Sequence, residues 1–196
     1  MVTALRARTR VAVGREPTPR AACSESPSVK TTEMGGPERG DAGGKKIKGR
    51  KRHLVVETLG LVLAVLLTSA GLDDGVAAPR LLGQVHPSHL PRLVTIGAEQ
   101  KYHNQALDAG MAAHRTGWRI EGQARPAGIQ GCTPREKRWV MERTHAWHGR
   151  YRRKSQADER SVESRTAMIH IRNVPLRLHR LAPGARPAFH YRSKAA

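Results

Sequence analysis

A single acidic side chain, Glu142, lies in the arginine-rich segment 138–153, the main part of the stretch 136–153. Val140 and Trp147 recur there at the spacing of one helix face, which predicts a helix over the whole segment with Glu142 on a different, basic face. A carboxylate four residues from Arg138 can form a surface ion pair, and such pairs contribute roughly a few tenths of a kcal/mol. Ordinary charge pairing is therefore one explanation of Glu142, and the rest of the chain must decide whether it does more.

Histidine and cysteine, the usual ligands of zinc, occur here in spacings that do not favour a zinc site. Two pairs of histidines lie three residues apart, His86 with His89 and His145 with His148. Neither pair has the H-E-x-x-H form or a third ligand nearby. The two cysteines, at positions 23 and 132, lie far apart and without a C-x-x-C partner, which predicts neither a disulfide framework nor a zinc knuckle. We expect the histidines to add to a basic surface and the setting to be reducing and intracellular.

The composition of the chain indicates a polyanionic partner. Its 196 residues include 35 lysines and arginines against 16 aspartates and glutamates, a formal net charge of +19. A charge of this size and sign is typical of proteins that bind nucleic acid. Aromatic residues make up only 4% of the chain, which argues against an RNA-binding platform of stacked Phe and Tyr rings. The length fits one domain of ordinary size with its own core.

The densest basic run extends from Lys45 to His53. A run of this kind can be a solvated face, a nuclear signal or a set of phosphate contacts. We predict phosphate contacts, because the run leads straight into a predicted strand. If all six charges neutralise phosphates, the slope of log K for DNA against log salt should be about −5. The six residues are Lys45, Lys46, Lys48, Arg50, Lys51 and Arg52.

The most apolar stretch, Leu54 to Leu72, is the candidate for a membrane segment. Its uninterrupted part, Leu59 to Leu67, has about half of the ~20 residues that a bilayer span requires. Glu57 would lie inside any extension of it, at a high cost in the bilayer. The preceding basic run would satisfy the positive-inside rule, so a single-span protein is a minor alternative. The main expectation is a cytoplasmic protein with no membrane contact.

Strand-like and helix-like patterns alternate along the chain, which predicts an α/β fold around a mixed sheet. Residues 1–20 are expected to be an irregular basic segment, 21–182 one domain and 183–196 a disordered tail. Asp73 and Ser161 have the positions of helix N-caps, and Pro175 should break or kink the last helix. The predicted strands are 21–32, 53–57, 61–69, 92–96 and 118–121, and the predicted helices are 76–82, 104–114, 136–153 and 161–181.

Three stretches of the sequence carry a resemblance to a known family. They are SVKTTEMGGPERGDAGGKKIKGRKRHLVVETLGLVLAVLLTSAG (Ser28 to Gly71), YHNQAL (Tyr102 to Leu107) and EKRWVMERTHAWHGRYRR (Glu136 to Arg153), the last followed by Asp-Glu-Arg at 158–160. Together they resemble the DDE transposases of bacterial insertion sequences, specifically the insertion-sequence-five group. The match extends from about residue 26 to residue 168, which is most of the chain.

The resemblance implies an incomplete RNase H-like fold, a mixed sheet with flanking helices, whose three acids converge at one edge of the sheet. On this basis Glu25, Glu99 and Glu142 are the catalytic residues and hold two Mg²⁺ or Mn²⁺ ions. The implied activity is metal-dependent DNA cleavage and strand transfer in transposition, by a homo-oligomer associated with the bacterial nucleoid. The arginines expected to contact the DNA backbone are Arg138, Arg143, Arg150, Arg152 and Arg153.

Several positions depart from the family pattern. Glu25 and Glu99 stand where the family has Asp, and Gln100 stands where a Gly commonly follows the second acid. Each Glu adds a methylene, and ligand shifts of about 1 Å can cost ~10²-fold in rate. The N-terminal helical domain of relatives has no counterpart in residues 1–20. We therefore expect an impaired copy, truncated or frameshifted, with a catalytically inactive DNA-binding remnant as the alternative.

Overall fold

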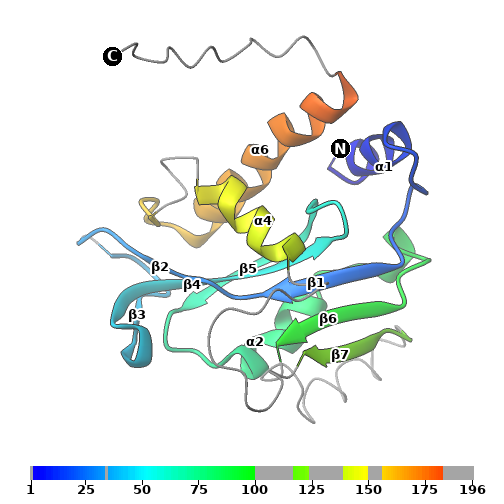
Figure 1. Ribbon diagram of the computed structural model, residues 1–196. Coiled ribbons are helices and arrows are strands. Elements are labelled where there is room, and N and C mark those ends of the chain that lie inside the picture. The colour runs from blue at the N-terminus through cyan, green and yellow to red at the C-terminus, as the bar shows by residue number, and fades with distance from the viewer. Residues whose placement is uncertain (1, 34, 100–116, 124–138, 150–155, 183–196) are drawn as a thin grey trace, which may run out of the picture.

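The computed structural model describes residues 2–33, 35–99, 117–123, 139–149 and 156–182 of the chain (Figure 1). The predicted helix 104–114 and the predicted tail 183–196 lie outside these residues, as do the ends of the predicted helix 136–153. Two layers of helices enclose a mixed sheet, which confirms the α/β prediction.

The centre of the sheet has the strand order β5-β4-β1-β6-β7. Strand β4 is antiparallel to β1 and to β5, whereas β6 is parallel to β1 and β7 is parallel to β6. The predicted hairpin of 53–57 and 61–69 is confirmed as β4 and β5, since its β-branched and apolar residues suit a strand buried on both faces. The five strands are β1 (Ala21–Glu25), β4 (Ile47–Glu57), β5 (Val62–Ser69), β6 (Thr95–Glu99) and β7 (Arg119–Gln123).

The amino-terminal half of β4 extends beyond the central sheet and carries two short strands. Strand β2 (Ser28–Lys30) and strand β3 (Gly40–Ala42) both pair with it in antiparallel fashion. A single 3₁₀ turn, η1 (Gly43–Lys45), connects β3 to β4. The approach of β2 to β4 requires Gly49, because a Cβ atom there would lie 1.9 Å from the carbonyl oxygen of Val29. Most of the basic run therefore belongs to β4 itself rather than to a segment before it.

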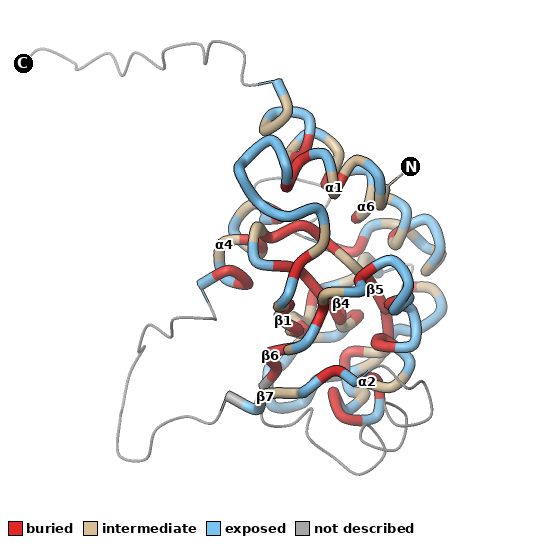
Figure 2. Tube along the Cα trace, turned by 90° about the vertical axis from the view of Figure 1, so that its right-hand side faces the viewer, coloured by how far each residue is buried: buried red, intermediate tan, exposed pale blue. Residues whose placement is uncertain are grey.

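Alternate residues of β4 point into two separate cores. Val55 packs in the cluster under helix α2 (Asp74–Leu82), whereas Leu54 and Val56 pack in the cluster under α4 (Trp139–Gly149) and α6 (Val162–Leu181). This period of two is what a strand imposes. Figure 2 shows the buried residues concentrated in the strands between the helices.

Both predicted helix caps are confirmed. The Asp73 carboxylate accepts a hydrogen bond from the backbone N–H of Gly75 at 2.8 Å, and the Ser161 hydroxyl accepts one from that of Ser164 at 3.0 Å. The predicted break at Pro175 is wrong, because α6 continues through it to Leu181. Pro175 lies on the exposed side of the helix, where water can bond the carbonyl that its missing N–H leaves unpaired.

The prediction that residues 1–20 are irregular is wrong for the first part of this segment. Helix α1 (Val2–Ala12) forms there and packs against α6, and its buried residues are Arg6, Thr9 and Arg10. A helix whose inward face is polar has no apolar stripe. Hydrophobic periodicity therefore could not reveal it.

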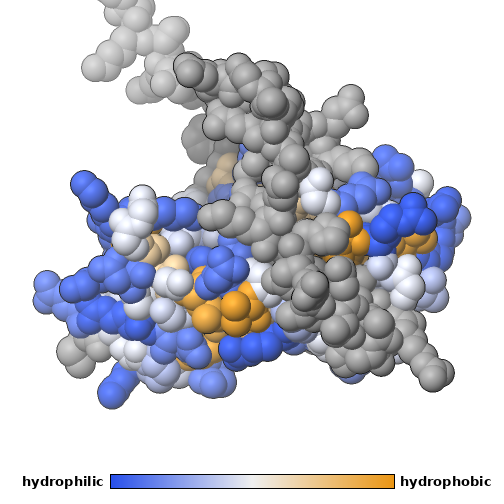
Figure 3. Space-filling view, turned by 90° about the horizontal axis from the view of Figure 1, so that it is seen from below, coloured by the Kyte–Doolittle hydropathy of each residue, from blue (hydrophilic) through white to orange (hydrophobic). Residues whose placement is uncertain are grey.

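The alternative of a membrane segment at Leu54 to Leu72 is wrong. These residues form the end of β4 and the whole of β5. Among the described residues no helix is both long and apolar enough to span a bilayer. The face drawn in Figure 3 is largely hydrophilic, with apolar side chains gathered near its centre.

Candidate functional site

Two of the three predicted acids lie on neighbouring strands. The parallel register pairs Ala22 with Ile96 and Cys23 with Gly97, and its continuation by two residues places Glu25 opposite Glu99. Glu25 is the last residue of β1 and Glu99 the last residue of β6. The carboxyl ends of parallel strands are the usual place for a site in an α/β sheet.

The third predicted acid, Glu142, lies on α4, which packs against β1. Val140, Met141 and Thr144 face the protein, whereas Glu142 is exposed. One turn further along the same helix, the Nε2 atom of His145 lies 2.7 Å from Oε2 of Glu25. Helix α4 therefore meets the end of β1 through His145, a contact that no motif predicted.

Carboxylate oxygens are the ligands that Mg²⁺ and Mn²⁺ prefer, so the three glutamates fit a divalent site in their chemistry. Their arrangement fits it less well, because His145 already holds one oxygen of Glu25 at 2.7 Å. Within the described residues, no three His, Cys, Asp or Glu side chains are grouped as metal ligands. A metal ion bound at Glu25 would have to displace or share the contact with His145.

The turn between β4 and β5 contacts α4 and allows this helix to pack closely on the sheet. Gly60 in this turn has a φ of +79°, and a Cβ atom there would lie 2.6 Å from Oγ1 of Thr144 and 3.1 Å from the Trp147 ring. The Thr144 hydroxyl donates instead to the carbonyl oxygen of Val140 at 2.7 Å. A residue larger than glycine would therefore push α4, with Glu142 and His145, away from β1.

Arg143 is enclosed by aromatic side chains. Its guanidinium carbon lies 4.0 Å from the centre of the Trp139 ring and 4.8 Å from that of Trp147. Burial lowers the pKa of Arg143, and the charge of Arg180 lowers it further. Both rings keep the guanidinium in place by cation–π attraction. The other four predicted arginines of this segment, Arg138, Arg150, Arg152 and Arg153, lie outside the described residues.

The basic run divides into an exposed half and an internal half. Lys45, Lys46 and Lys48 are exposed. Arg50 is fully buried and donates to the carbonyl oxygens of Pro37 at 2.9 Å and of Glu159 at 2.8 Å. Arg50 thus joins β4 to the loops on either side of it, and the prediction that it contacts DNA requires correction.

The next two residues of the run are also engaged within the protein. The amino group of Lys51 lies 3.0 Å from a carboxylate oxygen of Asp74 and donates to the carbonyl oxygen of Leu72 at 2.6 Å. Arg52 is buried, and this burial, with the charge of Arg165, lowers its pKa to about 10. Long side chains that project from a strand can turn inward as easily as outward, so the count of six phosphate contacts is too high.

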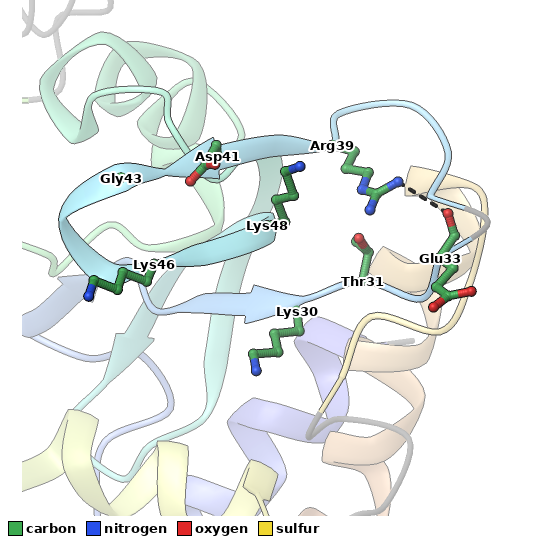
Figure 4. A pocket seen from close by; sticks show the side chains of 8 residues that line it. All are labelled: Lys30, Thr31, Glu33, Arg39, Asp41, Gly43, Lys46 and Lys48. Atoms are coloured by element: carbon green, nitrogen blue, oxygen red, sulfur yellow. Dashed lines mark hydrogen bonds between the residues drawn. The ribbon is translucent and has the colours of Figure 1, made fainter.

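A basic hollow of about 520 Å³ lies where β2, β3 and the start of β4 meet (Figure 4). It is lined by the cations Lys30, Arg39, Lys46 and Lys48, by the acids Glu33 and Asp41, and by Thr31 and Gly43. Lys30 and Arg39 were not predicted, because only the pairing of β2 and of β3 with β4 brings them beside the basic run. Arg39 is held by a bond from its Nη1 to the carbonyl oxygen of Glu33 at 3.1 Å.

Lys46 in this hollow has an unusual backbone. Its φ is +50° and its ψ +40°, the left-handed conformation, at the end of the turn η1. A residue with a Cβ atom pays about 1 kcal/mol for this conformation, which glycine adopts freely. The chain nevertheless has a lysine there, exposed at the rim of the hollow.

Comparisons with known proteins agree with this architecture. A family model described as the transposase DDE domain matches residues 17–121, a range that holds Glu25 and Glu99 and ends before Glu142. The chain is 31% identical over 134 residues to a Burkholderia cepacia protein assigned as the transposase for insertion sequence element IS402. The aligned part covers 63% of this chain and 60% of that relative.

A solved structure is similar in fold. One chain of the cryoEM structure of the simian T-cell lymphotropic virus intasome, in complex with PP2A regulatory subunit B56 gamma, superposes with a TM-score of 0.51 at 12% identity. The superposition covers 87% of this chain and 57% of that chain. At this identity the likeness concerns the fold alone, and it agrees with an RNase H-like arrangement of the mixed sheet.

Proposed function

Because the chain belongs to the transposase DDE domain family, we propose that it is a DNA transposase, which cleaves DNA and transfers strands in the movement of an insertion sequence. The observation that supports the proposal is the parallel register of β1 and β6 up to Cys23 and Gly97, whose continuation by two residues brings Glu25 opposite Glu99 at the carboxyl ends of the two strands. Helix α4, which carries Glu142, packs against the first of these strands. Three carboxylates from these elements are what a metal-dependent DNA nuclease requires.

In this proposal Glu25, Glu99 and Glu142 hold two Mg²⁺ or Mn²⁺ ions. Such ions, when bound, activate the attacking water or 3′ hydroxyl and stabilise the leaving oxygen at the DNA phosphate. Glu25 binds from β1 and Glu99 from β6, and Glu142 binds from the exposed side of α4. His145, which lies 2.7 Å from Glu25, orients that carboxylate.

DNA is bound in this proposal through its phosphate backbone. The exposed Lys45, Lys46 and Lys48 supply contacts, together with Lys30 and Arg39 of the basic hollow. Five phosphate contacts would give a slope of log K against log salt of about −4 to −5. The arginines at 138, 150, 152 and 153 remain predicted contacts in addition to these five.

Three further proposals follow from the family. The chain belongs to the insertion-sequence-five group, acts as a homo-oligomer when it joins two DNA ends, and works on the chromosome in the bacterial nucleoid. The stretches SVKTT and YHNQAL support the first of these. The second rests on the chemistry, because two transposon ends must be held together for strand transfer.

A catalytically inactive DNA-binding remnant is the second candidate function. Glu replaces Asp at both strand-end positions, and His145 occupies one oxygen of Glu25. Both features work against a well-formed metal site, whereas neither affects the basic hollow. DNA binding by such a remnant would be indifferent to a chelator.

The test is a nicking and strand-transfer assay on supercoiled DNA in Mg²⁺ and in Mn²⁺. It compares the natural chain with the double variant Glu25→Asp/Glu99→Asp, and with Glu16→Asp as a matched control at an exposed glutamate. We expect the double variant to cleave at least tenfold faster than the natural chain and the control to behave as the natural chain. If all three are inactive but bind DNA in a salt-sensitive way, the remnant is the correct function.

A further inference from the structure

Five arginines lie within electrostatic reach of one carboxylate in the central hairpin, and one of them is in direct contact with it. The carboxylate is Glu57, the last residue of β4, which is fully buried. The arginines come from three helices, α1 at the amino-terminal end of the chain and α4 and α6 in its last third. We call this group the Glu57 cluster: Glu57, Arg6, Arg10, Arg143, Arg177 and Arg180.

The hydrogen-bonding capacity of Glu57 is largely used within its own turn. Its Oε1 atom accepts from the backbone N–H groups of Leu59 at 2.9 Å and Leu61 at 3.1 Å. Its Oε2 atom accepts from Nη1 of Arg10, with which it forms a buried ion pair. Glu57 therefore neutralises Arg10 and has little left to offer the other four arginines.

These four arginines retain donors that find no acceptor within the described residues. They are the buried Nε atoms of Arg6, Arg143 and Arg177 and the buried Nη1 atom of Arg180. The outer nitrogens of Arg177 do bond to carbonyl oxygens, those of Val2 at 3.2 Å and Val62 at 3.3 Å. A buried donor without an acceptor costs about 1 to 3 kcal/mol, and more when it is charged. The cluster is thus rich in donors and poor in acceptors.

The net charge of the cluster also favours a bound anion. Five arginines against one glutamate leave four positive charges. Burial and, second, the neighbouring charge of Arg6 together lower the pKa of Arg177 to about 10, against the opposing effect of Glu57. Among the described residues, Glu57 is the acid whose charge acts on Arg6, Arg177 and Arg180. An anion bound beside them would satisfy both the charge and the donors.

The cluster reaches the surface between α4 and α6. Arg143 and Arg180 are partly exposed there, and both lie over the Trp147 ring, at 4.8 Å and 5.3 Å from its centre. Arg6 and Arg177 lie deeper and are buried. Arg143 follows Glu142 directly on α4, so the partly exposed edge of the cluster is next to the proposed metal ligand on the same helix.

We propose that the Glu57 cluster binds a phosphate group, and that in the working protein this is a phosphodiester of the DNA backbone. Guanidinium groups bind phosphate by paired N–H···O bonds, and several of them around one tetrahedral anion supply more donors than a planar carboxylate can accept. Helix α1 contributes Arg6 from outside the residues that the family model matches. The assignment to DNA rests on the proposed function, whereas the phosphate site itself does not.

The site is tested first with inorganic phosphate as the probe. Thermal unfolding of the full chain is followed in phosphate and in chloride at equal ionic strength, for the natural chain, Arg180→Gln and Arg8→Gln, the last a matched control at an exposed arginine of α1. A ligand that binds the folded state raises the midpoint with its concentration. We expect phosphate to raise the midpoint of the natural chain and of Arg8→Gln by several degrees, and that of Arg180→Gln by at most half as much. An equal rise in all three, or no rise in the natural chain, overturns the site.

The second measurement identifies the source of the phosphate. Binding of a labelled duplex is measured against salt in the presence of EDTA, where no metal chemistry occurs. We expect Arg180→Gln to reduce the slope of log K against log salt by about 1, the loss of one phosphate contact. Arg143→Gln serves as a second variant if Arg180→Gln does not fold. A normal slope in a variant that has lost its response to phosphate overturns the assignment to DNA, and an absence of cleavage in the nicking assay affects only the proposed function.

Discussion

Replacement of Glu57 by Gln tests how much the buried carboxylate at the end of β4 stabilises the fold. Glu57 is fully buried, and the side chain of its partner Arg10 is 6% exposed. Glutamine keeps the size of the side chain and one oxygen for the N–H groups of Leu59 and Leu61. It removes the negative charge and turns an N–H₂ group toward Arg10, so that five guanidiniums face no acid within the cluster.

The expected loss of stability on this replacement follows from the burial of the ion pair. Loss of one partner of a buried ion pair costs about 3 to 5 kcal/mol, because the other charge stays buried without compensation. A domain of this kind has a free energy of unfolding of about 5 to 15 kcal/mol. We therefore expect Glu57→Gln to lose a fifth or more of the free energy of unfolding of the protein.

Urea unfolding measures this loss. With an m-value of about 2 kcal/mol/M, the midpoint should fall by roughly 2 M while m stays the same. The matched control is Glu16→Gln, because Glu16 also pairs with an arginine, Arg92, at 3.1 Å, but the two side chains are 67% and 40% exposed. That exposed pair should contribute less than about 1 kcal/mol. If the two variants differ by less than 1 kcal/mol, the charge of Glu57 is not what holds the cluster together.

Three further changes give separate tests. Lys46→Gly, at φ +50°, should raise the free energy of unfolding by about 1 kcal/mol yet weaken DNA binding, as urea unfolding and duplex titration would show. Gly60→Ala should place a Cβ atom 2.6 Å from Oγ1 of Thr144 and so displace α4. In the Glu25→Asp/Glu99→Asp protein this change should abolish nicking, while DNA binding in EDTA persists. Unchanged nicking would mean that α4 tolerates displacement. Burial lowers the pKa of His53 from 6.5 to about 4, so between these values the unfolded chain binds the extra proton. Stability should therefore be complete above pH 6.5 and fall by up to about 3 kcal/mol toward pH 4, and this part of the pH dependence should be absent in His53→Gln.

The parts of the fold that the sequence predicted well are those built from local patterns. The hairpin of β4 and β5 follows from β-branched runs, and the Asp73 and Ser161 caps follow from side chains that bond within three residues. Helix α1 could not be predicted in this way, because arginines form its buried face. Its partners in α6 lie more than 150 residues away in the chain.

In the candidate site, too, local patterns were predicted, whereas contacts between distant parts of the chain were not. Glu25 and Glu99 were found by family resemblance, whereas their alignment depends on the pairing of strands that lie about 70 residues apart. Arg50 could not be recognised as internal, since it bonds to backbone oxygens 13 and 109 residues away. His145 was placed on the basic face of its helix, and only the packing of α4 on β1 reveals its contact with Glu25.

Strand β4 sets a length scale for the DNA. Lys48 of the basic hollow lies near one end of the strand, and Glu57, the centre of the arginine cluster, lies at the other. The two residues are nine positions apart along the strand, a span of about 30 Å at ~3.4 Å per residue. B-form DNA rises ~3.4 Å per base pair, so a duplex that touches both ends must be roughly nine base pairs long, just under one helical turn. For the proposed function, in which the basic hollow and the Glu57 cluster both hold DNA, shorter duplexes would engage only one of the two ends of β4.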